Sequence, residues 1–264
     1  MFMPIGLIGG SGLYDIDGLD IREEISLSTP YGQPSSIYRR LVLNGTELIF
    51  LARHGIPHSI PPHKINYRAN IWGFKSLGVD EIISIGAVGG ISGEMRPGSI
   101  VIPDQIIDMT MGARPSTFYD GEKVVHVDFT APYCTRLRDI LLHAAGSAGL
   151  SVKKNGTYIC SNGPRLETAK EIQFFSLIGA DVVGMTAMPE AALARELEMC
   201  CAGISVVTNY AAGLAGARLT ATEVVDTMKN SLDAIKSLLR AAVAQIPAQR
   251  VCACKNALEG AEVK

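Results

Sequence analysis

Residues 179–209 restrict the fold of this chain more than any other stretch, because two apolar runs flank a helical pattern. The runs 181–185 and 203–207 are rich in valine and isoleucine, which is typical of buried strands. Between them, Thr186 and Pro189 are residue types favoured where a helix begins, and apolar residues then recur at helical spacing. The stretch therefore predicts a right-handed unit of strand, helix and strand, in which ligands bind beyond the carboxyl ends of the strands.

Polar residues and glycines mark the ends of several predicted strands. Glycine-rich turns follow the apolar runs 5–8 and 81–85, and such turns let backbone N–H groups approach an anion. The two strand ends of the 179–209 unit carry Met185, Thr186, Thr208 and Asn209. We expect a ligand site where these strand ends meet.

Strands and helices alternate along the rest of the chain. The Asn44-Gly45 pair lies between two apolar runs and predicts a β-hairpin. Helical spacing is found at 66–77, 137–150 and 222–244. The pattern predicts a single α/β domain over residues 1–248, with a mixed, twisted β-sheet flanked by helices. The polar tail 249–264 is expected to be loosely ordered.

Composition excludes several classes of protein. The 264 residues are 47% hydrophobic, which is ample for a core, and the net charge of −2 does not favour binding to nucleic acid. No apolar run is long enough to span a membrane, and the apolar start lacks the basic residues of a secretory signal. The six cysteines are therefore expected to be free thiols in a reducing cytoplasm. Cys252 and Cys254 are either a redox pair or an unpaired part of the tail.

Arg53 and His54 follow a predicted strand and are suited to an anion. A guanidinium offers a bidentate fork to phosphate or carboxylate, and an imidazole offers a pH-sensitive donor. A structural ion pair of Arg53 is the alternative. His58 and His63 lie nearby, but the histidine spacing matches no zinc motif, so no metal is expected. A dinucleotide fingerprint also fails, because Gly10 and Gly12 would require glycine where Asp15 stands.

A series of motifs in one order identifies a family that this chain resembles. The motifs begin at Gly9 (GGSGL), Thr29 (TPYGQPS), Ala52 (ARHG), His63 (HKINYRANI), Pro97 (PGSIVIPDQIIDMT), Arg114 (RPSTFYDG), Gly163 (GPRLETAKEI), Gly179 (GADVVGMTAMPEAALARE) and Val207 (VTNYAAG). Over residues 4–245 the chain resembles the trimeric purine nucleoside phosphorylases and their relatives, the S-methyl-5′-thioadenosine and S-methyl-5′-thioinosine phosphorylases. Each motif is weak alone, but the combination is specific.

The resemblance implies phosphorolysis in purine salvage. Inorganic phosphate attacks the anomeric carbon of a purine nucleoside, the base leaves, and a sugar 1-phosphate of inverted configuration forms. The family resemblance implies no metal or organic cofactor, and it implies a homo-oligomer, either a trimer or a hexamer. The transition state is expected to be oxocarbenium-like, so catalysis is largely electrostatic.

The resemblance also assigns roles to individual residues. Phosphate contacts are implied for Ser11, Arg53, His54 and Ala87, with Thr186 bonded to phosphate or sugar. The implied substrate contacts are Met185 at the ribose, Glu167, Thr208, Asn209 and Ala211 around the base, and His126 of a neighbouring subunit at the 5′ end. The catalytic candidates are Asn209, as the donor near N7 and O6 of the leaving purine, and His54.

Two departures from the methylthioadenosine branch bear on the substrate. That branch typically carries aspartates at the positions of Asn209 and Ala211, and neither residue is acidic here. Glu167 can accept the N1–H that only a 6-oxopurine carries, so hypoxanthine or guanine is the expected leaving base. At the 5′ end, Ala221 and Val224 would suit a methylthio group, so methylthioinosine competes with inosine and guanosine.

Other functions remain open from the sequence alone. S-methyl-5′-thioadenosine phosphorolysis is the alternative within the family. A phosphate-independent purine nucleosidase would not need Arg53 and His54 to hold phosphate. A nucleotide-dependent dehydrogenase is disfavoured by the failed fingerprint, and a purine-binding module without catalysis would show no turnover.

Overall fold

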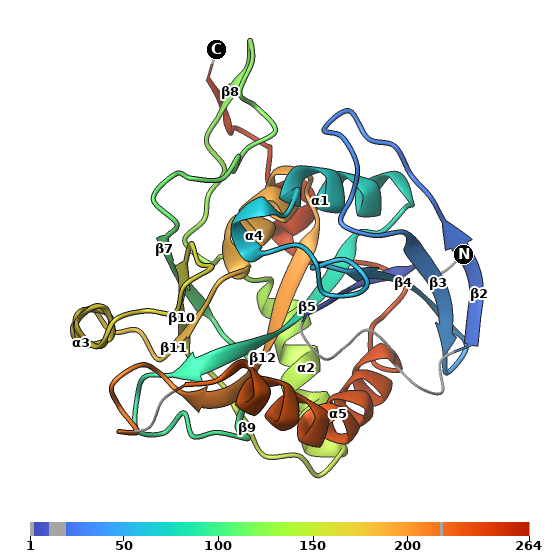
Figure 1. Ribbon diagram of the computed structural model, residues 1–264. Helices are drawn as coiled ribbons and strands as arrows, with labels where there is room; N and C mark the ends of the chain where they lie inside the picture. Colours follow the sequence, from blue (N-terminus) through green and yellow to red (C-terminus); the bar gives the residue numbers. More distant parts are fainter. Residues whose placement is uncertain (1–2, 11–19, 217–218, 264) are drawn as a thin grey trace.

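A single mixed β-sheet forms the centre of the computed structural model, which describes residues 3–10, 20–216 and 219–263 (Figure 1). Within these ranges the sheet has 11 strands, in the order β2-β3-β4-β1-β5-β11-β10-β7, with β12 between β5 and β6 and with β9 beside β6. The strands are β1 (Ile5–Gly9), β2 (Asp20–Ile25), β3 (Tyr38–Leu43), β4 (Thr46–Ala52), β5 (Glu81–Gly90), β6 (Ile100–Val101), β7 (Gln105–Met109), β9 (Val152–Lys153), β10 (Thr157–Ser161), β11 (Val182–Gly184) and β12 (Cys200–Tyr210).

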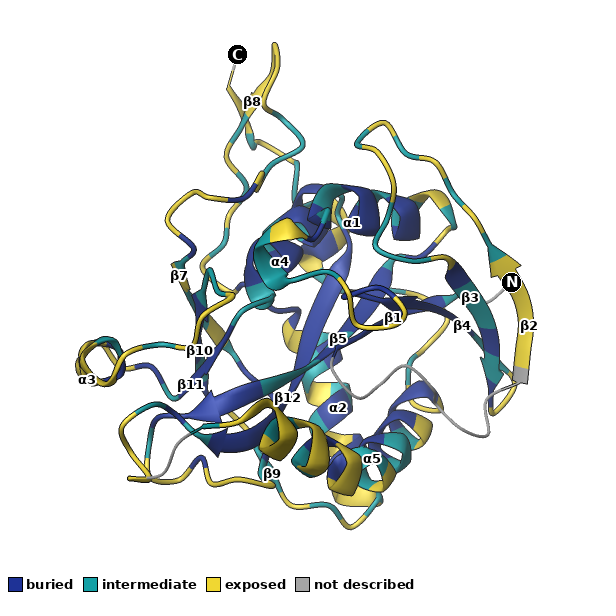
Figure 2. Ribbon diagram, viewed as in Figure 1, coloured by how far each residue is buried: buried dark blue, intermediate teal, exposed yellow. Residues whose placement is uncertain are grey.

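Helices cover both faces of this sheet. They are α1 (Tyr67–Ser76), α2 (Thr135–Ser147), α3 (Ala169–Leu177), α4 (Ala187–Glu196) and α5 (Ala221–Val243), with short 3-10 helices η1 (Pro62–Lys64) and η2 (Ala253–Asn256). Side chains of β1 alternate between the two faces: Leu7 packs in the core under α2 and α5, and Ile8 in the core under α1 and α4. Figure 2 shows the central strands as buried between these layers. The α/β class and the flanking helices agree with the sequence prediction.

The predicted hairpin is present with the expected turn. Strands β3 and β4 pair antiparallel and are joined by Asn44 and Gly45, whose φ angles are 51° and 79°. Positive φ at both central residues is the requirement of a type I′ turn, which asparagine and glycine meet at low cost. The Asn44-Gly45 signal therefore located this connection correctly.

The prediction of a parallel unit over 179–209 is wrong in one respect. β12 runs parallel to β5, but β11 pairs antiparallel with the far end of β5, with Val183 opposite Gly89. β11 and β12 therefore flank β5 in opposite directions. The backbone at Met188 is not helical and interrupts α4. The local sequence pattern identified the two strands and the helix, but it did not predict which strand each would pair with or in which direction.

The glycines after Ile85 also differ from expectation. They do not form a turn, because β5 continues as a strand through Gly90. A Cβ on Gly90 would lie 1.9 Å from the carbonyl oxygen of Met95, so glycine permits this close backbone approach. These glycines therefore extend β5 beyond the strand end that the sequence predicted.

The C-terminal tail packs on the domain rather than being loosely ordered. Arg250 donates to the Glu198 carbonyl at 2.8 Å and pairs with Asp80 at 2.9 Å, and Cys254 is buried in the core under α2 and α5. The last strand, β13 (Glu262–Val263), pairs with β8 (Val124–Val125) in a small second sheet. Polar composition did not reveal these anchors, because they depend on partners distant in sequence.

Among the described helices, none has both the length and the apolar character needed to cross a membrane.

Candidate active site

A cavity of about 200 Å³ opens where β5, β11 and β12 lie side by side. Its lining includes most of the predicted site residues, namely Arg53, His54, Ala87, Glu167, Met185, Thr186, Thr208, Asn209 and Ala211. Ser11 lies outside the described residues. The predicted residues thus meet in one cavity, although β11 and β12 run in opposite directions beside β5 and not as the parallel unit that the sequence predicted.

Two glycines of β5 leave the room that this cavity needs. Gly86 and Gly89 both line it. A Cβ on Gly89 would lie 3.2 Å from the Val183 side chain and 3.4 Å from Asn209 Nδ2, which is closer than most side-chain contacts. Strand β12 bulges between Val207 and Asn209, and a bulge of this kind redirects the side chains beside it.

Arg53 is buried at the end of β4, with only 1% of its surface exposed. Its Nε and Nη2 atoms pair with the Glu190 carboxylate of α4, and Nη2 also donates to Ser84 Oγ at 2.7 Å. Nη1 donates to the Ile85 carbonyl at 3.2 Å and lies close to Gly10, where a Cβ would sit 3.0 Å away. Among the described residues, one N–H of Nη1 has no partner and is available to a ligand in the cavity.

The Glu190 partner was missed from the sequence. Glu190 is 2% exposed and neutralises Arg53. The structural ion pair that was kept as an alternative is present, and Arg53 lines the cavity as well. No sequence signal links two residues that lie so far apart along the chain.

His54 is neutral at physiological pH. Burial, followed by the charge of Arg53, lowers its pKa from 6.5 to about 3. Nδ1 lies 2.8 Å from the Ile60 carbonyl, which can only accept, so Nδ1 carries the proton and Nε2 is an acceptor. The ring stacks on His58 with centroids 4.2 Å apart. The expectation of a pH-sensitive donor is therefore wrong for His54.

The Asn209 amide is fixed by two neighbours. Nδ2 donates to the Tyr210 carbonyl at 2.8 Å, and Oδ1 accepts from the Thr208 hydroxyl at 2.8 Å. Because the carbonyl can only accept, this network determines which end of the amide is the nitrogen. The second N–H of Nδ2 remains for a ligand, and the side chain lines the cavity beside Ala211.

Glu167 is held in place by a side chain of β10. Ser161 Oγ donates to Glu167 Oε1 at 2.5 Å. Glu167 is not the residue that caps the following helix, because Thr168 and Glu171 form the capping box that begins α3. Glu167 lines the cavity instead.

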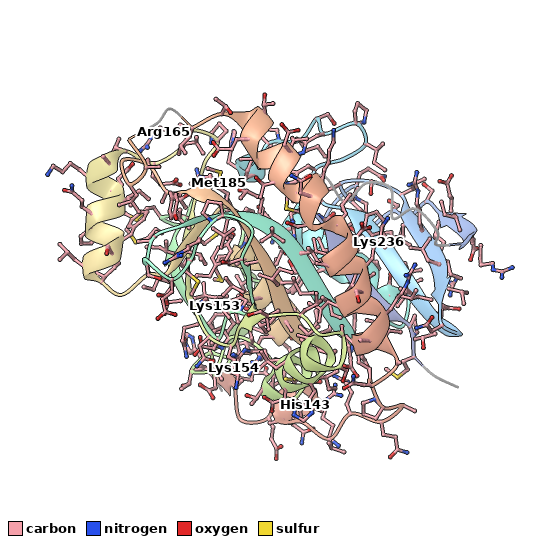
Figure 3. The ribbon with its side chains drawn as sticks, turned by 90° about the horizontal axis from the view of Figure 1, so that it is seen from below. His143, Lys153, Lys154, Arg165, Met185 and Lys236 are labelled. Carbon is pink, nitrogen blue, oxygen red and sulfur yellow. The ribbon has the colours of Figure 1, made fainter. Side chains whose placement is uncertain are left out.

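Met185 and Thr186 connect β11 to α4. Thr186 is the N-cap of α4, but its side chain makes no capping hydrogen bond, contrary to expectation, and its N–H donates to Tyr158 Oη at 3.3 Å. The Met185 carbonyl accepts from Arg114 Nη1 at 2.8 Å. Figure 3 shows Met185 between α3 and α5.

Arg114 is a second residue that the sequence analysis missed. It is 5% exposed and donates to the carbonyls of Met185, Met188 and Asn162. These contacts join the long loop after β7 to the end of β10 and to the start of α4. The motif RPSTFYDG, which begins at Arg114, marked the segment but not this positioning role.

The expected 5′ contacts divide into two groups. Val224 of α5 lines the cavity together with Leu219, whereas Ala221 and His126 are not among its lining residues. His126 is exposed, and its N–H donates to the Ala261 carbonyl at 2.9 Å beside the sheet of β8 and β13. That small sheet projects from the body of the chain in Figure 1.

Comparison with known proteins places this geometry in a family. The family model described as phosphorylase superfamily matches residues 4–244. A probable S-methyl-5′-thioinosine phosphorylase of Thermodesulfovibrio yellowstonii is 52% identical, over 98% of this chain and 97% of its own length. A 6-oxopurine nucleoside phosphorylase of Pyrococcus furiosus is 53% identical, over 98% of this chain and 99% of its own.

A solved structure gives the same result. The crystal structure of a methylthioadenosine phosphorylase from an antarctic soil metagenomic library superposes with a TM-score of 0.91 at 36% identity, covering 99% of this chain and 93% of that one. The chain belongs to the phosphorylase superfamily. It is an enzyme of the nucleoside phosphorylase type, which is a pentosyltransferase.

Proposed function

We propose that the enzyme catalyses phosphorolysis of 6-oxopurine nucleosides, releasing hypoxanthine or guanine and a pentose 1-phosphate. The observation that carries the proposal is the arrangement of Asn209, Glu167 and Ala211 in one cavity. The free N–H of the Asn209 amide donates to N7 or O6, and the Glu167 carboxylate accepts from N1–H. A 6-aminopurine has no N1–H, and its amino group would meet the methyl of Ala211 rather than a carboxylate.

The same contacts favour departure of the base. Negative charge grows on the purine as its bond to C1′ breaks, and a donor aimed at N7 or O6 stabilises that charge more in the transition state than in the substrate. Asn209 is held by Thr208 and Tyr210 before the reaction begins. This preorganisation avoids a reorientation cost during the step.

Phosphate lies on the opposite side of the sugar in this proposal. Arg53 Nη1 donates to a phosphate oxygen while Glu190 balances the guanidinium charge. Neutral His54 accepts from the O–H of a protonated phosphate through Nε2. The backbone of Ala87, beside Gly86, adds N–H donors at the cavity wall. The attacking oxygen bonds to C1′ as the electrons of the C1′–N9 bond pass to the purine.

The 5′ substituent is a methylthio group in the preferred substrate. Leu219 and Val224 give that part of the cavity an apolar wall. Burying a thiomethyl group there is favourable, whereas a 5′-hydroxyl would lose its hydrogen bonds to water. The relative named as an S-methyl-5′-thioinosine phosphorylase, at 52% identity, supports this choice.

The active unit in this proposal is a homo-oligomer, a trimer or a hexamer, located in the cytoplasm. In such an assembly, exposed His126 and the sheet of β8 and β13 would contact a neighbouring subunit. The six free cysteines are consistent with a reducing compartment. Sedimentation velocity at assay concentration tests the assembly, and a fully active monomer would contradict it.

Phosphate dependence tests the reaction itself. We expect hypoxanthine release from methylthioinosine and inosine only when phosphate is added, with a sugar 1-phosphate visible by phosphorus NMR, and with a higher kcat/KM for methylthioinosine. Equal base release without phosphate would identify a hydrolase. Binding of base without turnover would identify a binding module.

A further inference from the structure

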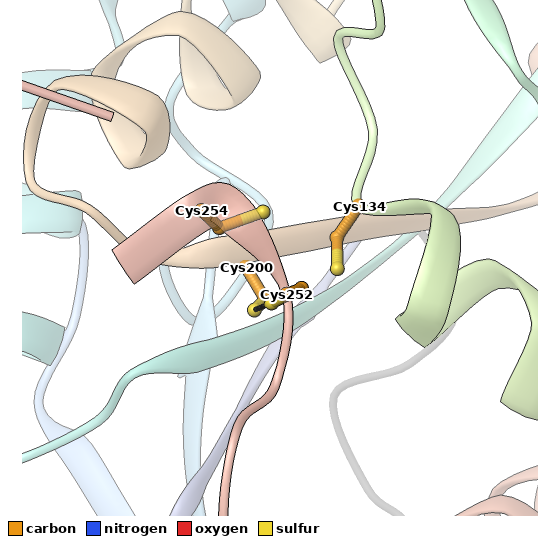
Figure 4. A group of neighbouring side chains, drawn as sticks. All are labelled: Cys134, Cys200, Cys252 and Cys254. Atoms are coloured by element: carbon orange, nitrogen blue, oxygen red, sulfur yellow. Dashed lines mark hydrogen bonds between the residues drawn. The ribbon is translucent and has the colours of Figure 1, made fainter. Parts of the chain in front are cut away.

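Four cysteines from three parts of the chain meet at one point, remote from the active site. They are Cys134, Cys200, Cys252 and Cys254, and their sulfur atoms all lie within 4.8 Å of one another (Figure 4). Three of the four are buried, and Cys252 is half-buried. Convergence of four thiols on a single small volume is a stronger observation than proximity of one pair.

The positions of the four residues come from fixed elements. Cys134 is the N-cap of α2, Cys200 begins β12, and Cys252 and Cys254 lie at the start of η2. The cluster thus joins the C-terminal tail to a helix and to the central sheet.

The dimensions match a thiolate metal site. Zinc binds cysteine sulfur at about 2.3 Å, so four tetrahedral sulfurs lie about 3.8 Å apart. The four Sγ atoms lie no more than 4.8 Å apart, and those of Cys200 and Cys252 are 3.2 Å apart, so the observed separations span the expected one. Small side-chain rotations would bring all four sulfurs to one ion.

N–H donors surround part of the cluster and can stabilise thiolates. Nη2 of Arg136 lies 3.7 Å from Cys200 Sγ, and Nη1 of Arg250 lies 4.0 Å from it. Nε and Nη1 of Arg136 are buried without a hydrogen-bond partner among the described residues. The N-terminus of α2 adds the positive end of a helix dipole beside Cys134. Both guanidinium groups also pair with carboxylates, Arg136 with Glu81 and Arg250 with Asp80, so they give the sulfurs N–H donors rather than uncompensated positive charge.

We propose that Cys134, Cys200, Cys252 and Cys254 bind one structural zinc ion, which fixes the C-terminal tail to α2 and β12. Four thiolate ligands in tetrahedral geometry leave no open position, so the ion is structural rather than catalytic. Binding displaces the thiol protons to solvent. Cys200 and Asn209 stand at opposite ends of β12, about 30 Å apart at roughly 3.3 Å per residue, so the ion takes no part in the reaction.

Metal content of the full-length chain, purified with a thiol-free reductant under nitrogen, tests the proposal. We expect about one zinc per chain, and replacement by Co(II) should give the intense visible bands of tetrahedral cobalt thiolate. A chain that contains no zinc, and that takes up neither Zn(II) nor Co(II), would overturn the proposal. A thiol count on chain purified without reductant would then show whether the cysteines are free or oxidised to disulfides.

Single cysteine substitutions test which residues bind the ion. Cys134→Ser and Cys252→Ser should lose the metal and lower the Tm by roughly 5 °C or more. Cys201→Ser is the matched control, because Cys201 is buried next to Cys200 but packs in the core on the other face of the sheet. It should keep the metal. Zinc retained at full stoichiometry in both Cys134→Ser and Cys252→Ser would contradict the assignment, and wild-type metal content decides the question even if a variant fails to fold.

Discussion

Arg53 and Glu190 form a buried ion pair at the wall of the cavity, and this pairing limits how Arg53 can meet phosphate. Glu190, Ser84 and the Ile85 carbonyl engage all three nitrogen atoms, and among the described residues only one N–H, on Nη1, has no partner. A phosphate bound here would receive one charge-assisted hydrogen bond rather than a bidentate pair. Such a bond contributes roughly 1.5–3 kcal/mol.

We predict that Arg53→Lys raises the phosphate KM by about 10- to 100-fold and leaves the nucleoside KM nearly unchanged. A lysine can pair with Glu190, but its single nitrogen cannot also reach the cavity. Steady-state kinetics with each substrate varied in turn measure both constants. Arg138→Lys is the control, because Arg138 donates to the Pro103 carbonyl outside the cavity. A phosphate KM equal to that of the wild type would remove Arg53 from the phosphate site.

Residues that line the cavity were easier to predict than residues that position them. Asn209 and Glu167 stand at a strand end and in a motif, so local sequence identified them. Arg114 and Glu190 act through contacts with segments far along the chain, and nothing in their local sequence shows those partners. Tertiary packing alone reveals such roles.

At the scale of elements, α4 is tied to the sheet through Glu190. This carboxylate accepts from Arg53 at the end of β4 and from Ser84 of β5, the latter at 2.8 Å. Both charges are almost fully buried, so each requires the other. The pair therefore links β4, β5 and α4 beside the cavity that Arg53 lines.

We predict that Glu190→Gln lowers the free energy of unfolding by about 3 kcal/mol, because it leaves the buried Arg53 guanidinium without a counter-charge. Glu24→Gln, which breaks an exposed pair with Arg39, should cost less than about 1 kcal/mol. Urea unfolding of both variants gives the comparison. Equal losses would show that burial of the Arg53 pair has no energetic consequence.

Element types were predicted better than element neighbours. The hairpin at Asn44-Gly45, the strand β12 and the helix α5 all follow from local patterns. The antiparallel placement of β11 does not, because it depends on β5 extending to Gly90 and on contacts between β11 and that far end. Periodicity reports which face of an element is buried but not the direction of the strand beside it.

At the scale of the whole molecule, burial of His54 links stability to pH. Its pKa is about 3 in the folded chain and ordinarily 6.5. As pH falls from 6.5 toward 3, the unfolded chain binds a proton at this residue and the folded chain does not. The free energy of unfolding must therefore fall across that window, by up to about 1.4 kcal/mol per pH unit for one proton.

We predict that His54→Asn reduces this loss of stability between pH 7 and pH 5. An asparagine amide can still donate to the Ile60 carbonyl but does not titrate. His143→Asn is the control, because His143 is exposed on α2, where Figure 3 labels it. Unfolding free energies at the two pH values measure the difference. An unchanged pH dependence in His54→Asn would mean that His54 is charged in the folded chain.

The central claim is that this cavity selects a 6-oxopurine through Asn209 and Glu167. The most direct measurement compares kcat/KM for methylthioinosine and methylthioadenosine at saturating phosphate, because these substrates differ only in the base. We predict a ratio of at least about 10² in favour of methylthioinosine. In the variant Asn209→Asp/Ala211→Asp, two carboxylates would face O6, and the ratio should fall sharply. A wild-type ratio near one or below it, or a folded double variant with the wild-type ratio, would contradict the claim.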